Sequence, residues 1–261
     1  MSDMNPYRAQ WDNYAESWSP NIRPDRHLND DSWPGDEWGN EERWAAIFKT
    51  MFLDFGAKDW RNCVEIGPGS GKYTSLLMKN SESHIIAFDI SPSYMEVMKK
   101  RLSQDIEKQR VEPALINAEK SDELLDYLNN RNLGRKLDAF FSIDAMVHVD
   151  LQYLTTYFIT AALTLKENGL MIMTLANAIS RKGFRHLLNG VKPYYPLQGK
   201  PTEKFEFLSP DIVNLVLGKL GFQVNFTNPF GTGIDVDRDL YVVARLVDIE
   251  RSETFRDAIS N

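Results

Sequence analysis

The chain has 261 residues, of which 43% are hydrophobic and 26% are charged, and its formal net charge is −7. This length and composition suit one large globular domain, or one domain with an added segment. The negative balance, without a block of basic residues, argues against nucleic acid as the main partner.

Other features of the whole chain limit the compartments and partners that we expect for the protein. The single cysteine, Cys63, allows no disulfide within the chain, which fits a reducing compartment. The four histidines are far apart in the sequence, so we expect no metal site. No apolar stretch approaches the ~20 residues that span a bilayer. We therefore expect a cytoplasmic protein, monomer or homodimer, without a membrane partner.

The first 60 residues differ from the rest of the chain because they contain all six tryptophans. Polar and Gly/Pro stretches such as NDDSWPGDEWGN interrupt them, which predicts short helices and loops. The segment closes with EERWAAIFKTMFLDF, whose apolar residues recur at helical spacing. We call residues 1–60 the cap segment and expect its last helix to pack on the core.

From residue 61 onward, strand-like and helix-like segments alternate. The predicted strands are RNCVEIG, HIIAFDI, VEPALINA, LDAFFSID and GLMIMTLAN, and helical segments lie between them. Ser91 and Pro92 supply an N-cap and a first-turn proline for one of these helices. Alternation of this kind indicates a mostly parallel sheet with helices on both faces.

The last two predicted strands, FQVNFTNPF and RDLYVVARLVD, are joined by a link too short for a crossover helix. They should therefore pair antiparallel. The predicted fold is α/β, a doubly wound, seven-stranded, mostly parallel sheet with a C-terminal antiparallel pair. This domain covers residues 61–248, with a tail at 249–261, and residues 178–208 are expected to be an irregular insertion.

A glycine-rich loop, VEIGPGSGKYT, follows the first predicted strand and indicates a nucleotide-like ligand. A triphosphate-binding P-loop would need glycine at Ile66 and Ser or Thr at Tyr73. A dinucleotide loop would need its third glycine at Lys72. Neither pattern is complete, although a nicotinamide enzyme stays open as an alternative.

The run from Glu65 to Gly71 reads E-x-G-x-G-x-G and resembles the first motif of class I S-adenosylmethionine-dependent methyltransferases. Glycines there let the backbone pass close to the ligand. Asp89, 24 residues after Glu65, ends the next strand. A carboxylate at that place is a suitable acceptor for the two O–H groups of a free ribose.

The resemblance extends over roughly residues 61–248. NAEKSDELL resembles the segment that holds the adenine, and FFSIDAMVHVD resembles the strand end beside the reactive methyl. S-adenosylmethionine is thus the implied cofactor. The implied cofactor-binding residues are Glu65, Gly67, Pro68, Gly69, Gly71, Tyr73, Asp89, Ile90, Ala118, Glu119, Ser142 and Ile143.

The acceptor should bind beyond the carboxyl ends of the strands, next to the cofactor. His148 is the candidate general base, and Asp144 is a second catalytic candidate that holds a cationic acceptor or orients His148. Two segments are expected to cover the acceptor, the cap segment and a lid at 178–208. Their candidate substrate-binding residues are Tyr14, Trp18, Trp38, Tyr194 and Tyr195, with Arg181, Lys182 and Arg185 available for an anionic group.

These features predict an enzyme that methylates an oxygen or nitrogen of a small molecule. SIDA at 142–145 stands where enzymes acting on nucleobase amines or protein amides carry D/N-P-P-Y/F, which disfavours those acceptors. A protein methyltransferase and a non-catalytic subunit of the same fold, which binds a partner, remain alternatives.

Overall fold

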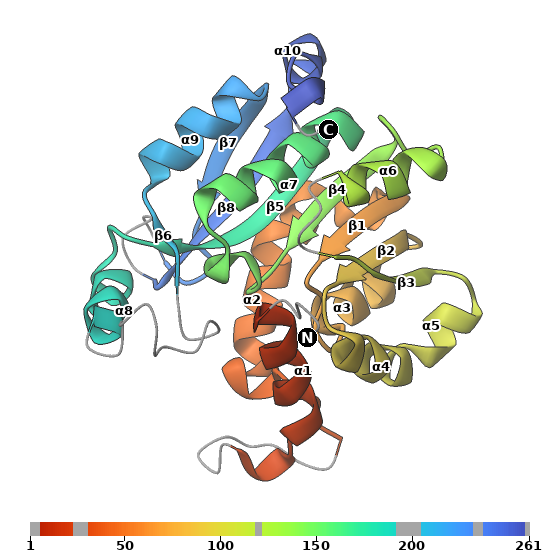
Figure 1. Ribbon diagram of the computed structural model, residues 1–261, viewed down its shortest axis with the longest axis vertical. Helices are drawn as coiled ribbons and strands as arrows, with labels where there is room; N and C mark the ends of the chain where they lie inside the picture. Colours follow the sequence, from red (N-terminus) through yellow and green to blue (C-terminus); the bar gives the residue numbers. More distant parts are fainter. Residues whose placement is uncertain (1–5, 23–30, 118–121, 192–204, 232–236, 259–261) are drawn as a thin grey trace.

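The computed structural model describes residues 6–22, 31–117, 122–191, 205–231 and 237–258. Its centre is a single sheet in the order β3-β2-β1-β4-β5-β8-β7 (Figure 1). The strands of this path are β1 (Asn62–Ile66), β2 (His84–Asp89), β3 (Val111–Leu115), β4 (Leu137–Ser142), β5 (Leu165–Asn177), β7 (Phe222–Thr227) and β8 (Asp239–Leu246).

The strand directions confirm the predicted topology. β1 pairs in parallel with β2 on one side and with β4 on the other. The connection from β3 to β4 therefore crosses to the other half of the sheet, and the switch point of the strand order lies between β1 and β4. β8 lies between β5 and β7 and is antiparallel to both. A two-residue strand that the sequence analysis did not predict, β6 (Phe207–Leu208), adds to the end of β5 in parallel.

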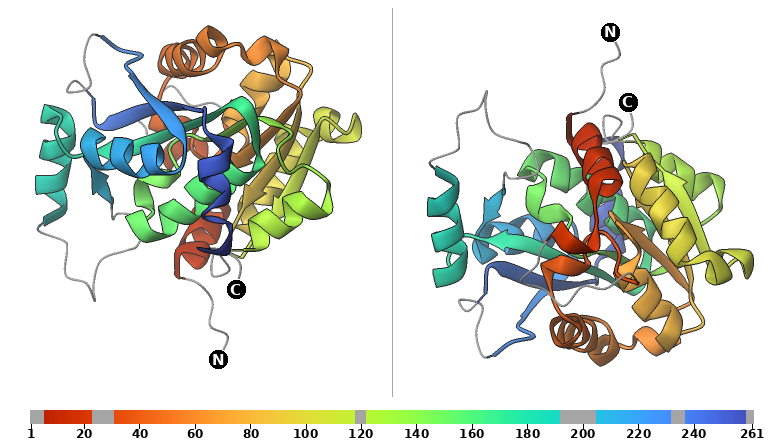
Figure 2. Two further views of the ribbon diagram at one scale, coloured as in Figure 1. Left: turned by 90° about the horizontal axis from the view of Figure 1, so that it is seen from above. Right: turned by 90° about the horizontal axis from the view of Figure 1, so that it is seen from below.

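Helices cover both faces of the sheet (Figure 2). On one face, the core includes apolar residues of α6 (Glu123–Asn130), α7 (Leu151–Thr164) and α9 (Pro210–Lys219). The core of the other face includes residues of α2 (Glu41–Met51), α3 (Lys72–Asn80) and α4 (Pro92–Arg101). Alternate side chains of each strand serve the two cores, which explains why the strands are nearly all apolar. The remaining helices are α1 (Pro6–Ser17), α5 (Ser103–Glu107), α8 (Arg181–Val191) and α10 (Ile249–Glu253).

The expectation of an irregular segment at 178–208 was wrong for its first part, because α8 occupies residues 181–191. The Ser180 hydroxyl accepts a hydrogen bond from the Gly183 backbone N–H at 2.8 Å, as an N-cap does. Gly183 packs so closely on the Asn177 carbonyl that a Cβ would lie 1.8 Å from its oxygen. Glycine therefore permits this contact, although glycines in a sequence argue against a helix. Residues 192–204, including Tyr194 and Tyr195, lie outside the described residues.

The cap segment packs against the sheet domain at several points. α1 lies beside α4 in Figures 1 and 2, and the Asp12 carboxylate accepts a hydrogen bond from the Ser93 backbone N–H at 3.1 Å. The last cap helix, α2, buries Ile47, Phe48 and Met51 in the core, as its apolar spacing predicted. Within the described ranges, none of the helices has the length and apolar character needed to cross a membrane.

Candidate active site

A cavity of about 1080 Å³ opens at the carboxyl edge of the parallel strands. The loops after β1, β2 and β4 line it, together with the start of β8 and parts of the cap segment. Because β8 is antiparallel, its first residues reach the same edge at which the parallel strands end. The volume is at the upper end of the roughly 300–1,000 Å³ typical of ligand sites, so there is room for two ligands.

The glycine loop forms one wall of this cavity. Gly67 and Gly69 line it with φ angles of 65° and 55°, a region that favours glycine. A Cβ on Gly67 would lie 2.5 Å from the Cβ of Ala145. A Cβ on Gly69 would meet only the Tyr94 ring, at 3.5 Å. The loop thus combines a tight approach to the β4 end with an open backbone surface at Gly69.

Two buried side chains support this loop from below. Glu65, 2% exposed, accepts a hydrogen bond from the Thr74 hydroxyl, which ties β1 to α3. Burial raises the pKa of Glu65 to about 8. The Ser142 hydroxyl donates to the Ile66 carbonyl at 2.7 Å and so joins β4 to the start of the loop. Both residues therefore fix the loop and do not line the cavity.

Asp89 ends β2 and faces the cavity. Its carboxylate accepts hydrogen bonds from the backbone N–H groups of Ser91 at 2.9 Å and Gly69 at 3.2 Å. Burial raises the pKa of Asp89 to about 6, although these N–H groups favour the ionised form. Asp89 is thus held in place beside the glycine loop, with a carboxylate that titrates close to physiological pH.

Two cationic side chains bond the cap segment to the region of the glycine loop. Lys72 donates from its Nζ to the Gly35 carbonyl at 2.8 Å and lies 4.0 Å from the centre of the Trp44 ring. Burial lowers the pKa of Lys72 to about 8. Arg101 joins Asp36 of the cap to Ser70 of the loop, at 3.3 and 2.8 Å. These contacts place cap residues directly above the loop.

Two buried polar atoms in this region have no hydrogen-bond partner within the described part of the chain, the Tyr94 hydroxyl and Oε1 of Glu37. Unpaired buried polar atoms are uncommon in folded proteins and call for a partner such as a bound ligand. Tyr94 lines the cavity beside Gly69. An unpaired hydroxyl, an open glycine backbone and the Asp89 carboxylate fit a ligand with an amino acid end and a ribose.

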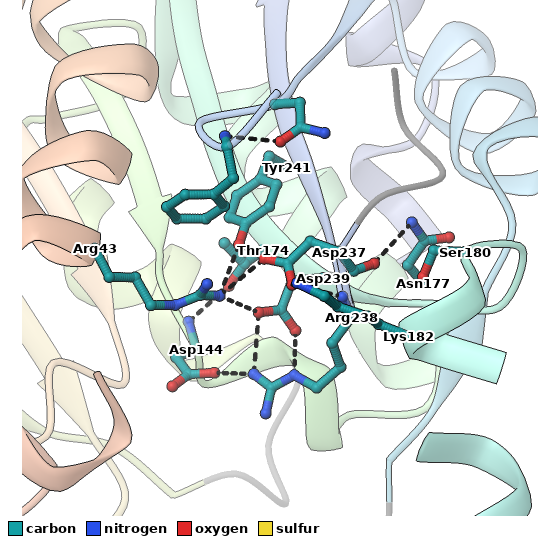
Figure 3. A network of polar contacts seen from close by, with 12 residues as sticks. Arg43, Asp144, Thr174, Asn177, Ser180, Lys182, Asp237, Arg238, Asp239 and Tyr241 are labelled. Atoms are coloured by element: carbon teal, nitrogen blue, oxygen red, sulfur yellow. Dashed lines mark hydrogen bonds and ion pairs between the residues drawn. The ribbon is translucent and has the colours of Figure 1, made fainter. Parts of the chain in front are cut away.

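The opposite half of the cavity contains a charged cluster, shown in Figure 3. Asp144, just after β4, has a left-handed backbone with φ of 64°. Its backbone N–H donates to the Thr174 hydroxyl at 2.7 Å, and its Oδ1 accepts from Arg238 at 2.8 Å. Arg238 also bonds Asp239, with its Nε 2.6 Å from Oδ1. Arg238 therefore bridges two carboxylates, one from the loop after β4 and one from the start of β8.

A second guanidinium completes the cluster from the cap segment. Nη2 of Arg43, on α2, lies 3.0 Å from Asp237 and 3.3 Å from Asp239, and 2.9 Å from the Tyr241 hydroxyl. Burial raises the pKa of Asp239. For Asp237, burial acts in the same direction, but the Tyr241 hydroxyl and Arg43 outweigh it and lower the pKa. The cluster thus joins the cap to the start of β8.

His148 lines the cavity between these two halves. It belongs to a short turn, Met146–His148, after β4. Its ring centre lies 5.5 Å from that of Trp11 on α1 and 4.7 Å from that of Phe205. These aromatic contacts hold the imidazole at the wall of the cavity.

Comparison with known proteins identifies the domain. Residues 64–173 match the family model described as "Methyltransferase domain". This range is similar to methyltransferase domains, and the fold of the chain is that of S-adenosylmethionine-dependent methyltransferases. The matched range contains the glycine loop, Asp89, Asp144 and His148. Two solved structures of this fold contain bound S-adenosylhomocysteine. A search of curated proteins found no match.

Solved methyltransferase structures share the fold at 14% sequence identity. One is the Haemonchus contortus phosphoethanolamine N-methyltransferase 2 with bound S-adenosylhomocysteine, with a TM-score of 0.56 over 81% of this chain and 56% of that one. Another is the Synechocystis PCC 6803 magnesium protoporphyrin IX methyltransferase, with a TM-score of 0.53 over 78% and 81%. A third is the CurJ carbon methyltransferase, with a TM-score of 0.51 over 73% and 50%. This chain thus spans about half the length of the first and third.

The structure divides the predicted residues into three groups. Those that line the cavity are Gly67, Pro68, Gly69, Tyr73, Asp89, Ile90, Ile143, Asp144, His148 and Trp38. Those described but outside the cavity lining are Glu65, Gly71, Ser142, Tyr14 and Trp18. Gly71 starts α3 and packs on α4, where a Cβ would lie 2.7 Å from Leu102. Trp18 donates from its ring nitrogen to Glu37 at 2.9 Å. Ala118 and Glu119 lie outside the described residues.

Sequence reasoning missed several residues that line the cavity, among them Trp11, Lys72, Tyr94 and the charged cluster of Arg43, Asp237, Arg238 and Asp239. DVDRD at 235–239 contains three acids and an arginine, and this density of charge before an apolar strand was the available signal. This signal could not identify Arg43 as the partner of Asp237, because the two residues are 194 positions apart in the sequence.

Proposed function

We propose that this protein transfers the methyl group of S-adenosylmethionine to an oxygen or nitrogen of a small molecule bound in the acceptor half of the cavity. The observation that carries this proposal is the single cavity, which runs from the glycine loop to the charged cluster. Cap residues such as Trp11 and Trp38 line it from above, which favours a small acceptor over a protein segment.

S-adenosylmethionine, when bound, supplies an electrophilic methyl group on a sulfonium. In this proposal Asp89 binds the ribose, Gly67 and Gly69 give access to the backbone, and the Tyr94 hydroxyl meets a polar group of the cofactor. The walls exclude water and align the acceptor, which is the main contribution an enzyme makes to a direct displacement. His148 takes a proton from the acceptor where the acceptor carries one.

Formation of S-adenosylhomocysteine from S-adenosylmethionine, measured over a panel of small amines, alcohols, phenols and carboxylates, tests the function. We expect turnover with at least one acceptor class and none without acceptor. His148→Ala should then reduce turnover about 10²–10⁴-fold if His148 is the base. It should leave the affinity for S-adenosylhomocysteine within about twofold, because cofactor contacts come from other loops. Binding of S-adenosylhomocysteine without turnover on any panel member would favour the non-catalytic alternative.

The cap segment and α8 are proposed as the cover of the acceptor. Lys182 on α8 lines the cavity, and Trp11 on α1 contacts His148. Closure of these elements should slow their amide exchange when cofactor and acceptor are both bound. Equal exchange in the free and the doubly bound protein would contradict a covering role.

A further inference from the structure

The charged cluster contains more carboxylate than guanidinium. Three acids, Asp144, Asp237 and Asp239, contact two arginines, Arg43 and Arg238. Two lysines lie near the cluster in the described part of the chain: Lys182, whose Nζ lies 3.6 Å from Asp237 and whose side chain is 63% exposed, and Lys72, which interacts electrostatically with Asp144. Lys72 is itself engaged by the Gly35 carbonyl and by Asp36. Apart from these lysines, the cluster has one negative charge in excess at the wall of the cavity.

Asp144 is the member of the cluster that presents this charge to a ligand. The side chains of Asp237 and Asp239 are each 5% exposed, whereas that of Asp144 is 35% exposed and faces the cavity. Arg238 occupies Oδ1 of Asp144. In Figure 3 the second oxygen of Asp144 points away from Arg238. This oxygen is therefore available to a hydrogen-bond donor in the cavity.

The carboxylate of Asp144 is also held rigidly. A left-handed backbone at a residue other than glycine is unfavourable, and such conformations persist where surrounding contacts enforce them. The contacts here are the hydrogen bond from the Asp144 N–H to Thr174 and the ion pair with Arg238. The position is also next to Ala145, which touches the glycine loop at Gly67. A ligand bound at Asp144 therefore lies beside the cofactor wall.

We propose that the acceptor is an amine and that its nitrogen binds Asp144, whose carboxylate Arg238 orients. This inference rests on the proposed function and selects nitrogen over oxygen. In the reaction, the lone pair of the neutral amine forms the N–C bond as the C–S bond breaks, and the electron pair of that bond stays on sulfur. The positive charge moves from sulfur to nitrogen, and the new ammonium then releases a proton to solvent. Asp144 stabilises the charge where it develops.

An anionic acceptor suits this half of the cavity less well. The two arginines are already paired with buried carboxylates, so they offer little net positive charge to a phenolate or carboxylate. Asp144 would repel such a group at close range. The aromatic lining of the cavity, which includes Tyr153 and, beside His148, Trp11, instead suits a cation, because aromatic faces attract positive charge. The ring of Phe230 is already covered by Arg43.

The test measures binding by titration calorimetry at pH 7.5 in protein saturated with S-adenosylhomocysteine. The probes are benzylammonium, benzyl alcohol and benzoate, which share a ring and differ in charge. The variant is Asp144→Asn, which keeps the size of the side chain and tolerates a left-handed backbone. The control is Glu42→Gln, which removes an exposed carboxylate at the cavity wall outside the cluster.

We expect benzylammonium to bind more tightly than benzyl alcohol and benzoate, and Asp144→Asn to weaken it at least about tenfold, as expected for loss of a hydrogen bond to a charged group. Glu42→Gln should change its affinity by less than about twofold, since exposed charges interact weakly. Benzoate as the tightest probe, or equal benzylammonium affinity in wild type and Asp144→Asn, would overturn the proposal, as would failure of benzylammonium to bind at all. Failure of the wild type to bind S-adenosylhomocysteine would instead contradict the proposed function, so the two failures are distinguishable.

Discussion

The two halves of the cavity are built in different ways. The half at the glycine loop, which we propose binds the cofactor and call the cofactor half, uses residues from one continuous stretch, from Glu65 on β1 to Tyr94 on α4. The acceptor half combines Arg43 from α2, Asp144 after β4 and Asp239 at the start of β8. A site that depends on local motifs can recur in many enzymes, whereas the proposed acceptor half is assembled from segments that are distant in the sequence.

The two halves of the cavity also differ in the number of charged side chains that contact one another. In the cofactor half, Gly67, Gly69 and the carboxylate of Asp89 line the cavity, and two backbone N–H groups hold that carboxylate in place. In the acceptor half, five charged side chains contact one another. A change in the acceptor half should therefore affect stability, and a change in the cofactor half should affect mainly ligand affinity.

The largest effect is expected from Arg238→Ala. This change leaves Asp239, which is 5% exposed, without its closest cation. Removing one partner of a buried ion pair costs about 3–5 kcal/mol, and the lower end applies because Arg238 itself is 31% exposed. Urea unfolding should show this loss of unfolding free energy.

The matched control is Arg245→Ala on the same strand, whose guanidinium donates to the Asn168 carbonyl at the surface. Its cost should stay below about 1 kcal/mol. If both variants lost the same small amount, the cluster would not be a stabilising feature of the fold.

Gly69→Val should abolish binding of S-adenosylhomocysteine, with a loss of more than ~100-fold or about 2.8 kcal/mol. The side chain would fill the open space beside the glycine loop. Because φ is 55° at this position, valine also strains the backbone. Gly69→Asn separates the two causes, since asparagine tolerates this backbone, and it should also abolish binding as measured by calorimetry.

Gly218→Ala provides the control for glycine replacement. It lies in α9, where a Cβ would meet no atom within 4 Å. Affinity should be unchanged, and stability should rise by roughly 0.5–1 kcal/mol, the usual gain of alanine over glycine in a helix. Normal affinity in both Gly69 variants would contradict the assignment of the cofactor half.

Asp89→Asn should weaken the binding of S-adenosylhomocysteine at pH 8 by about 1.5–3 kcal/mol, the range for a hydrogen bond to a charged group. The pKa of Asp89 is raised to about 6, so the wild-type carboxylate becomes protonated below that pH and loses acceptor capacity. Wild-type affinity should thus fall as the pH decreases from 7 to 5, by up to about tenfold per unit. The variant should lack this dependence, and parallel pH profiles would exclude Asp89 as the ribose acceptor.

Glu65→Gln should change the free energy of unfolding least near pH 5 and should raise it at higher pH. The pKa of Glu65 is raised from 4.5 to about 8, so the folded protein holds a proton that the unfolded chain releases between these values. Wild-type stability should therefore fall through this window by at most about 1.4 kcal/mol per pH unit. Urea unfolding of both proteins at pH 6 and 8 measures the difference, which would not change with pH if Glu65 titrated normally.

The strand order illustrates what could be predicted. Alternating strands and helices, with a short link before the last strand, predicted a parallel sheet that ends in an antiparallel pair, and this was confirmed. The helix α8 was not predicted, because Gly183 lowers helix propensity and its close contact with Asn177 is visible only in the folded chain. The short strand β6 was missed for a similar reason, since two residues carry no periodicity.

The spacing of residues along the sequence predicted the fold, which the structure confirms, and S-adenosylmethionine as the cofactor. Gly67, Gly69 and Asp89 are constrained by local backbone geometry and by the strand ends on which they lie, and local constraints leave a recognisable spacing. The proposed acceptor site, in contrast, is visible only in the folded chain. Arg43, Asp144 and Asp239 meet because α2 packs beside the antiparallel strand β8, and charge pairing across 196 residues imposes no pattern along the chain. The same arrangement leaves one oxygen of Asp144 facing the cavity, and thus directs our proposal toward an amine.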